Sequence, residues 1–358
     1  MYEPPRCAYR DCPNHHSPSP RFYTRHGHYR SRCKPHPIPR FKCRVCGRTF
    51  SRQSFRMDCG DRKPHLNSKV VLLLCSGVGF RQTARILKVR RKNLEAKARK
   101  ISRHIAALED NQLARIRAED RMGKLGSSLA LQFDEFESYE TRRNTRPLSI
   151  PVVIETLSRF RFAASAATIR PRGKMTEARR KAIETEDRRF GRRMDRSRAA
   201  CLRVLKIAAR ARPGATVVKI DTDEKSTYPK LIARAFQGRQ IGHSQTSSRA
   251  PRHHGTPLGP INLTEAILRD HMGRLRRESW LVSKERSFLN LHLRMINGFR
   301  NWVRPRFNRD LETPAQIAGF APRRLGLGEI LGCRQDWGGR SPCPFRGCGS
   351  GSQEAMAV

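Results

Sequence analysis

Two aspartates follow apolar, strand-like runs in a chain that is otherwise strongly basic. Asp134 directly follows the run 129–133 (Leu-Ala-Leu-Gln-Phe), so we expect it to end that strand. Asp223 follows the run 217–222 (Val-Val-Lys-Ile-Asp-Thr). Acids at the exits of two strands are what a two-metal phosphodiester site requires, because two Mg²⁺ ions about 4 Å apart activate the attacking oxygen and stabilise the leaving oxygen. Helix capping or pairing with arginines would explain the same acids, and their position alone leaves both interpretations open.

Two close cysteine pairs lie near the start of the chain. Four residues separate Cys7 from Cys12, and two separate Cys43 from Cys46, which a glycine follows. Two such pairs can present four thiolates tetrahedrally to a structural Zn²⁺, whose binding energy then stabilises a small domain. No general-base carboxylate accompanies them, which argues against catalytic zinc. The alternative is a set of unliganded cysteines, and the possible substitute ligands are His15, His16, His26, His28 and Cys33.

The charge of the chain indicates a polyanionic partner. Its 358 residues contain 74 Lys plus Arg against 31 Asp plus Glu, a formal net charge of +43. Nucleic acid fits best, because every neutralised phosphate releases counterions. The competing partner, an anionic membrane, finds no amphipathic anchor or lipidation motif in the sequence. An arginine bias of the genome would explain part of the excess but not where the cysteines and acids fall.

The start of the chain has no apolar segment typical of a secretory signal, and the apolar run 70–75 is too short to span a bilayer. We therefore expect a cytoplasmic, nucleoid-associated protein. In a reducing compartment the 11 cysteines are better candidates for metal ligands or buried apolar residues than for disulfides.

The segment 66–118 has the apolar periodicity of helices, after a Cys- and His-rich module over 1–60. Helices over 68–76 and 80–87, a turn at Lys88-Val89 and a basic third helix from Arg90 resemble a helix-turn-helix. An ordinary three-helix bundle with a solvated basic face is the alternative. The side chains expected to reach the major groove or its phosphates are Arg90, Arg91, Lys92, Asn93, Lys97 and Arg99.

From about residue 127 the pattern becomes strand-like. Runs over 129–133, 150–154 and 160–163 predict an antiparallel meander, and a charged helical insert over 176–212 precedes another strand at 216–220. Long helical patterns follow at 262–276 and 284–302. This order predicts an α+β or α/β multidomain protein with a catalytic core over 127–305. We expect an extension over 306–358, poorly ordered from residue 332.

Short stretches in a shared order resemble DDE-type insertion-sequence transposases, which join a zinc ribbon and a helix-turn-helix to an RNase-H-like core of mixed sheet. The resemblance spans residues 5–330. Each stretch is short, and it is their common order that is specific. The matching stretches are 40–51 (RFKCRVCGRTFS), 133–138 (FDEFES), 222–228 (TDEKSTY), 243–248 (HSQTSS), 261–269 (INLTEAILR), 274–284 (RLRRESWLVSK), 301–304 (NWVR) and 313–319 (TPAQIAG).

The resemblance implies that Asp134 and Asp223 are metal ligands, with Asp221 in reserve one strand period earlier. At the family's third position stands Asn262, with the expected basic residue, Arg269, seven positions on. Glu265 lies three residues after Asn262, and we favour it slightly because a carboxylate binds Mg²⁺ better than an amide does. A capping box over 262–265 would explain both residues without chemistry.

The resemblance also implies metal-assisted phosphoryl transfer without a covalent enzyme intermediate, using two Mg²⁺ or Mn²⁺ ions. Arg269 would lie near the scissile phosphate. Arg274, Arg277 and Lys284 would contact the DNA backbone, although a solvated basic face is the alternative for each. The partners would be terminal-repeat and target DNA, and synapsis implies at least a dimer. The rival functions are a DNA-binding regulator derived from a transposase, an RNase-H-like nuclease that never joins ends, and a structural RNA-binding protein.

Overall fold

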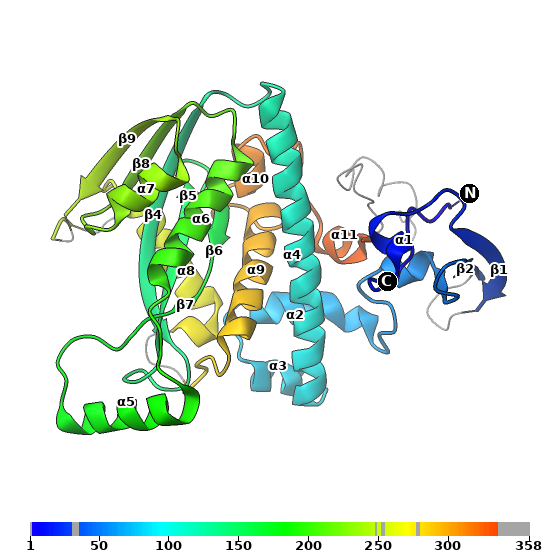
Figure 1. Ribbon diagram of the computed structural model, residues 1–358, viewed down its shortest axis with the longest axis horizontal. Helices are drawn as coiled ribbons and strands as arrows, with labels where there is room; N and C mark the ends of the chain where they lie inside the picture. Colours follow the sequence, from blue (N-terminus) through cyan, green and yellow to red (C-terminus); the bar gives the residue numbers. More distant parts are fainter. Residues whose placement is uncertain (1, 31–35, 248, 252–254, 277–279, 336–358) are drawn as a thin grey trace. The chain divides into compact units, whose positions relative to one another are not determined.

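The computed structural model describes residues 2–30, 36–247, 249–251, 255–276 and 280–335, and the chain divides into two compact units (Figure 1). Unit 1 comprises 1–65 with 328–358, and unit 2 comprises 66–327. No described helix is both long enough and apolar enough to cross a membrane.

Unit 1 is built around a small antiparallel sheet of three strands in the order β1-β2-β3. Its aromatic side chains Phe22, Phe41, Phe50 and Phe55 are buried together with three of the cysteines. Phe22 and Phe41 are therefore core residues of this unit. The elements are α1 (Pro13–His16), β1 (Tyr23–Tyr29), β2 (Ile38–Cys43), β3 (Thr49–Ser51) and α11 (Leu327–Gly332), whose first residue closes unit 2.

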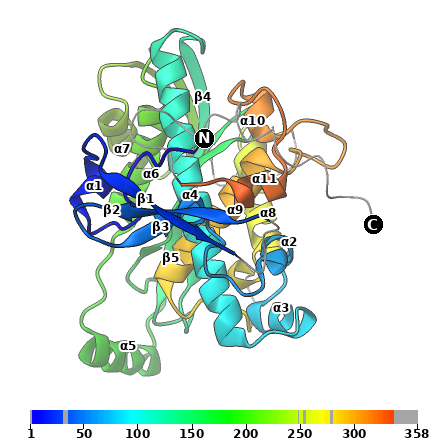
Figure 2. The same cartoon turned by 90° about the vertical axis from the view of Figure 1, so that its right-hand side faces the viewer.

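Unit 2 begins with three helices, of which the last is 31 residues long. Its buried positions recur every three or four residues, and this face lies along α9 (Figure 1, Figure 2). The two helices approach closely because Gly298 has no side chain, and a Cβ there would lie 2.3 Å from Ile105 Cγ2. The helices are α2 (Asn67–Leu74), α3 (Phe80–Ile86), α4 (Arg91–Arg121) and α9 (Arg286–Trp302).

The centre of unit 2 is a mixed six-stranded sheet in the order β6-β5-β4-β8-β9, with β7 paired to β5. β5 is antiparallel to both β4 and β6, whereas β8 is parallel to both β4 and β9. The prediction of a mixed α and β body is thus confirmed. The strands are β4 (Ser128–Tyr139), β5 (Pro147–Glu155), β6 (Arg161–Ala164), β7 (Ala167–Thr168), β8 (Val217–Asp223) and β9 (Gln240–Thr246).

Helices cover both faces of this sheet. Phe133 of β4 packs edge-on against Tyr228 of α7, with ring centroids 4.8 Å apart, on the face where α6 also lies (Figure 1). The neighbouring residue Gln132 points to the opposite face and contacts α8. The remaining helices are α5 (Glu177–Phe190), α6 (Ser197–Ala211), α7 (Tyr228–Ala235), α8 (Gly259–His271) and α10 (Pro314–Ile317). The segment predicted as an insert, 176–212, therefore includes a helix of the core layer, α6.

One strand boundary differs from the prediction. Asp134 does not end its strand, because β4 continues to Tyr139. The polar residues after Asp134 remain paired to β5, from Glu135 opposite Pro151 to Tyr139 opposite Pro147. Backbone pairing with a long neighbouring strand outweighs the loss of apolar alternation, which was the signal used to end the strand.

A buried ion pair joins the end of α4 to the segment before β8. Asp120 is fully buried; its Oδ1 accepts a hydrogen bond from Arg212 Nε at 2.7 Å, and its Oδ2 accepts one from the backbone N–H of Gly214. We expect Asp120→Ala to lower the free energy of unfolding by about 3–5 kcal/mol, since it leaves a buried guanidinium unpaired. Urea denaturation measures this. The control Asp270→Ala removes a mostly exposed carboxylate, and an equal loss there would contradict the argument.

Candidate functional site

The register of β4 and β8 brings Asp134 and Asp223 to equivalent positions. The parallel pairs run from Ser128 opposite Val217 to Gln132 opposite Asp221, a constant offset. The paired residues end there, and the same offset continued by two residues places Asp134 level with Asp223, the last residue of β8. Because side chains alternate between the two faces of a sheet, both acids lie on the same sheet face as Gln132. Neighbouring strands of a sheet are about 4.8 Å apart. Both acids are half-buried.

Local hydrogen bonds orient the two carboxylates. The backbone N–H of Glu135 donates to Asp134 Oδ1 at 2.6 Å, and that of Lys225 donates to Asp223 Oδ1 at 3.2 Å. Each of these two hydrogen bonds involves the Oδ1 atom of its aspartate.

Helix α8 is fastened to the same face by a glutamine from the sheet. Gln132 Oε1 accepts from the backbone N–H of Ile261 at 2.9 Å, and Gln132 Nε2 donates to the carbonyl of Pro257 at 2.6 Å. The first bond satisfies an N–H in the first turn of α8, whose N-cap residue, Leu258, makes no side-chain cap. Since α8 begins at Gly259, Asn262 is not an N-cap, and the capping box considered for 262–265 is wrong. The reason is Pro260, which favours an earlier helix start.

Along α8, Glu265 comes level with Asp134. Ile261 is bonded to Gln132, and the guanidinium of Arg269 lies over the ring of Phe136, 4.7 Å from its centroid. Four helix residues rise about 6 Å, and two strand residues rise about 7 Å. Glu265, four residues after Ile261, is therefore level with Asp134, two residues after Gln132.

The carboxylate of Glu265 is buried and lies 3.8 Å from Arg269 Nη1. It does not form a tight group with Asp134 and Asp223. Among the described residues, the one set of three or more His, Cys, Asp or Glu with ligand atoms all within 4.8 Å of one another is the four cysteines. Asn262, half-buried, lies one residue beyond Ile261.

We expect Gln132→Met to lower the free energy of unfolding by about 1–3 kcal/mol, because the Ile261 N–H and Pro257 carbonyl lose their partner. Hydrogen exchange should accelerate in the first turn of α8. Gln240→Met, at an exposed site at the start of β9, is the control. Unchanged exchange in α8 would show that Gln132 does not hold this helix.

On the opposite face of β4, Glu135 forms an ion pair with Lys225 that was not predicted from the sequence. Lys225 Nζ donates to Glu135 Oε1 at 2.5 Å, and the Ser149 hydroxyl donates to Glu135 Oε2. Burial raises the pKa of Glu135, but these hydrogen bonds outweigh it and lower the pKa below its usual value. The pair links β4 to the loop after β8. Only the position of Lys225, two residues after Asp223, could have indicated it.

Tyr228 packs on the same sheet face as Phe133 and Glu135, opposite the face that carries Asp134 and Asp223. Its hydroxyl is buried without a hydrogen-bond partner in the described part of the chain. Burial raises its pKa, and so do the negative charges of Glu135, Asp134 and Asp223. The surroundings of the Tyr228 hydroxyl are therefore electronegative.

The predicted DNA-contacting residues of α4 divide into two groups. Arg90, Arg91, Lys92 and Asn93 are exposed at its start. Lys97 instead donates to Asn67 Oδ1 at 2.7 Å, and Arg99 pairs with Glu285 at 2.9 Å while covering the ring of Phe288 at 4.6 Å.

The residues after α8 also differ in their surroundings. Arg274 lies over the rings of Phe80 and Phe288, 4.9 Å from each centroid, and burial lowers its pKa to about 10. Lys284 is exposed, and Arg277 lies outside the described residues.

Beyond the acids, the surface of unit 2 is hollowed. The hollow has a volume of about 670 Å³ and begins at Glu137, three residues past Asp134 on β4. Among the described residues Glu137 is the acid that lines it, and four of its arginines form ion pairs with acids outside the lining, namely Arg170 with Asp187, Arg172 with Asp195, Arg269 with Glu265 and Arg276 with Asp270. Its arginines are Arg143, Arg170, Arg172, Arg179, Arg269 and Arg276.

In unit 1 the two cysteine pairs meet as the spacing predicted. The Sγ atoms of Cys7 and Cys46 are 3.7 Å apart, and those of Cys12 and Cys43 are 3.8 Å apart. Four sulfurs held tetrahedrally at about 2.3 Å from a zinc ion would be about 3.8 Å from one another. The donor set and its spacing thus fit Zn²⁺, and the group could bind it.

Hydrogen bonds to sulfur support this fit. Burial raises the pKa of Cys7 and Cys12, while the backbone N–H groups of Tyr9 and Asn14 act against it. At Cys46, hydrogen bonds from Arg48 outweigh burial and lower the pKa to about 6. N–H groups directed at sulfur stabilise the thiolate, which is the form that binds metal.

The substitute ligands are not needed for this group. His15 bonds the carbonyl of Cys7 and His16 that of Arg10, each through one ring nitrogen. His26 and His28 are exposed on β1, and Cys33 lies outside the described residues.

Comparisons with known proteins give little further information. No family model matches the chain, and no curated protein does. Among solved structures, it is similar to one described as "Crystal structure of a pre-cleavage Mos1 transpososome", with 9% sequence identity over 65% of this chain and 76% of that chain. The TM-score is 0.17, which is too low to support a conclusion about fold or activity.

Proposed function

We propose that this chain is a transposase that cleaves DNA and transfers the freed strand by metal-dependent phosphoryl transfer. The observation that carries the proposal is the parallel register of β4 and β8, which, continued by two residues past Gln132 and Asp221, places Asp134 level with Asp223. Carboxylates so placed, next to an arginine-lined hollow, match the needs of divalent cations and a phosphodiester substrate.

We further propose that unit 2 contains an RNase-H-like core. Its mixed sheet, with helices on both faces and acids on two adjacent parallel strands, supports this assignment. We assign α2, α3 and α4 to a helix-turn-helix, with Lys88, at φ 49°, turning the chain between the last two helices. The exposed start of α4 would contact DNA.

In the proposed site, Asp134 and Asp223 hold the cations, and Asp221 remains in reserve. Two Mg²⁺ or Mn²⁺ ions would supply activation of the attacking oxygen and stabilisation of the leaving oxygen. Arg269, held over Phe136, would neutralise charge at the phosphate, and the hollow beyond it would orient the DNA backbone.

The third ligand is Glu265 or Asn262. The level of Glu265 opposite Asp134 favours the carboxylate, but it must turn away from Arg269 to reach a shared ion. Cleavage assays of Glu265→Gln and Asn262→Ala separate the two, because only the variant that lacks the true ligand should be inactive.

The four-cysteine group would hold a structural Zn²⁺, with unit 1 as a second DNA-binding element. The DNA would comprise the terminal repeats of the mobile element and its target. Holding two ends together would need at least a dimer.

The test is a cleavage and joining assay with purified protein and DNA that carries its flanking repeats, in Mg²⁺ or Mn²⁺. Joined products are expected. Cut ends that are never joined would instead indicate a nuclease. Tight binding without cleavage in either metal would indicate a DNA-binding regulator.

A further inference from the structure

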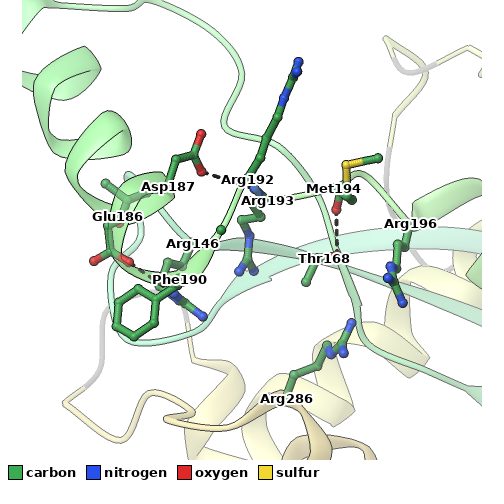
Figure 3. A pocket seen from close by; sticks show the side chains of 12 residues that line it. Arg146, Thr168, Glu186, Asp187, Phe190, Arg192, Arg193, Met194, Arg196 and Arg286 are labelled. Atoms are coloured by element: carbon green, nitrogen blue, oxygen red, sulfur yellow. Dashed lines mark hydrogen bonds and ion pairs between the residues drawn. The ribbon is translucent and has the colours of Figure 1, made fainter.

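Unit 2 has a second basic cavity, apart from the hollow next to the acids. It has a volume of about 260 Å³ and lies among the end of α5, the segment before α6, and the start of α9 (Figure 3). It is lined by Arg146, Arg192, Arg193, Arg196 and Arg286, and by two acids, Glu186 and Asp187.

The acids of this cavity are already neutralised. Glu186 pairs with Arg146 at 3.1 Å, and Asp187 pairs with Arg170 of the neighbouring hollow at 3.4 Å. Arg193 pairs with Glu140 at 3.1 Å. The internal ion pairs therefore leave the other arginines of the cavity unmatched.

Arg192, Arg196 and Arg286 make no side-chain hydrogen bond or ion pair within the described part of the chain. Figure 3 shows Arg196 and Arg286 extending from different elements toward the same part of the pocket. Like charges brought together without a counter-ion repel one another, and an anion between them removes that cost.

A buried hydroxyl adds an independent indication of a ligand. Thr145 lines the cavity and is 5% exposed as a whole residue, and its Oγ1 has no hydrogen-bond partner in the described part of the chain. Burying an unpaired hydroxyl is unfavourable, so a ligand oxygen that accepts from it would be stabilised there.

We propose that this cavity binds a phosphodiester group of DNA, away from the catalytic acids. Guanidinium groups match the oxygens of a phosphate, and the Thr145 hydroxyl supplies a further donor. The proposal rests on the proposed function in one respect, that DNA is the substrate. A free phosphate has the same chemistry, and the experiment below distinguishes the two sources.

The cavity lies beyond the end of β4, at a distance from Asp134 that the strand length sets. Thr145 and Arg146 follow β4, which ends at Tyr139, five residues or about 17 Å beyond Asp134. B-DNA rises about 3.4 Å per base pair, so a duplex running parallel to β4 would place the contacted phosphate about five base pairs from the scissile one.

The test is fluorescence anisotropy of the full chain with a duplex carrying its flanking repeats, titrated with salt in the absence of Mg²⁺. Arg196→Ala and Arg286→Ala should each weaken binding and reduce the slope of log K against log salt by about 0.9, the value for one lost phosphate contact. Arg210→Ala, at an exposed position in the last turn of α6, is the matched control and should leave the slope unchanged.

Thr145→Val tests the site without changing charge. Loss of the hydroxyl contact should weaken DNA binding about 5-fold with an unchanged salt slope. The Tm of the free protein should stay the same or rise, because an unpaired buried hydroxyl has been removed. A higher Tm with wild-type DNA affinity would show that no phosphate occupies the cavity.

Two further outcomes separate the possible failures. If inorganic phosphate raises the Tm of the wild type but not of Arg286→Ala, while both bind DNA equally, the ligand is a free anion and the proposal is overturned. If the wild type binds DNA but none of the cavity variants differs from it, this inference fails and the proposed function stands. Absence of salt-dependent DNA binding by the wild type would refute both.

Discussion

Asp134→Asn and Asp223→Asn will each reduce Mg²⁺-dependent cleavage by about 10⁴-fold, the scale observed when one member of a catalytic unit is removed. The two carboxylates share one face of adjacent parallel strands, so neither can replace the other. Asparagine keeps the shape of the side chain and loses the charge that holds a divalent cation. Single-turnover cleavage of the flanking-repeat duplex measures the effect.

DNA affinity in these variants should stay the same or increase slightly in the absence of metal. Each substitution removes a negative charge next to the expected path of the phosphates. Anisotropy titrations provide this control and show that the variants are folded.

Asp221→Asn is the matched control for the second position. Asp221 lies on the same strand and the same face, one strand period before Asp223 and opposite Gln132. It should retain most of the activity. An inactive Asp221→Asn beside an active Asp223→Asn would transfer the metal-binding role to Asp221, and full activity in Asp134→Asn would remove Asp134 from the site.

Cys43→Ser is expected to abolish zinc binding by the proposed four-cysteine site and to unfold the three-stranded sheet of unit 1. Structural zinc contributes about 10–16 kcal/mol in small domains, far more than the few buried aromatics of this unit can replace. Purified wild type should contain one zinc per chain, measured by release to a colorimetric chelator. The variant should contain none, bind DNA more weakly and show a smaller salt slope.

Cys59→Ser is the matched control, because Cys59 is an exposed cysteine of the same unit outside the four-sulfur group. It should retain zinc, folding and DNA affinity. If Cys43→Ser kept its zinc and its near-UV circular dichroism, the four cysteines would not be the ligands.

The sequence by itself determined the features that depend on local spacing and composition. The two cysteine pairs indicated a four-sulfur group, and the structure brings those four sulfurs together. Helical periodicity placed α2, α3 and the start of α4 within a few residues. Net charge predicts an anionic partner, which stays a prediction. Each of these signals lies in the residue types themselves or within a few turns of chain, so no distant contact was needed to read it.

Only the tertiary structure decided how distant residues combine. The alignment of Asp134 with Asp223 depends on pairing two strands that are 89 residues apart at each matched position, and no local pattern encodes that register. The fastening of α8 by Gln132 has the same origin, because a strand side chain supplies the cap that the helix's own sequence lacks.

Neighbouring elements likewise determined what the basic residues do. Arg274, expected on a solvated or DNA-facing surface, lies over two aromatic rings contributed by α3 and α9. Arg196 and Arg286, which are 90 positions apart, are left without acidic partners in one cavity. An arginine has the same local signature whether it is stacked, paired or exposed, and only its three-dimensional neighbours distinguish these states.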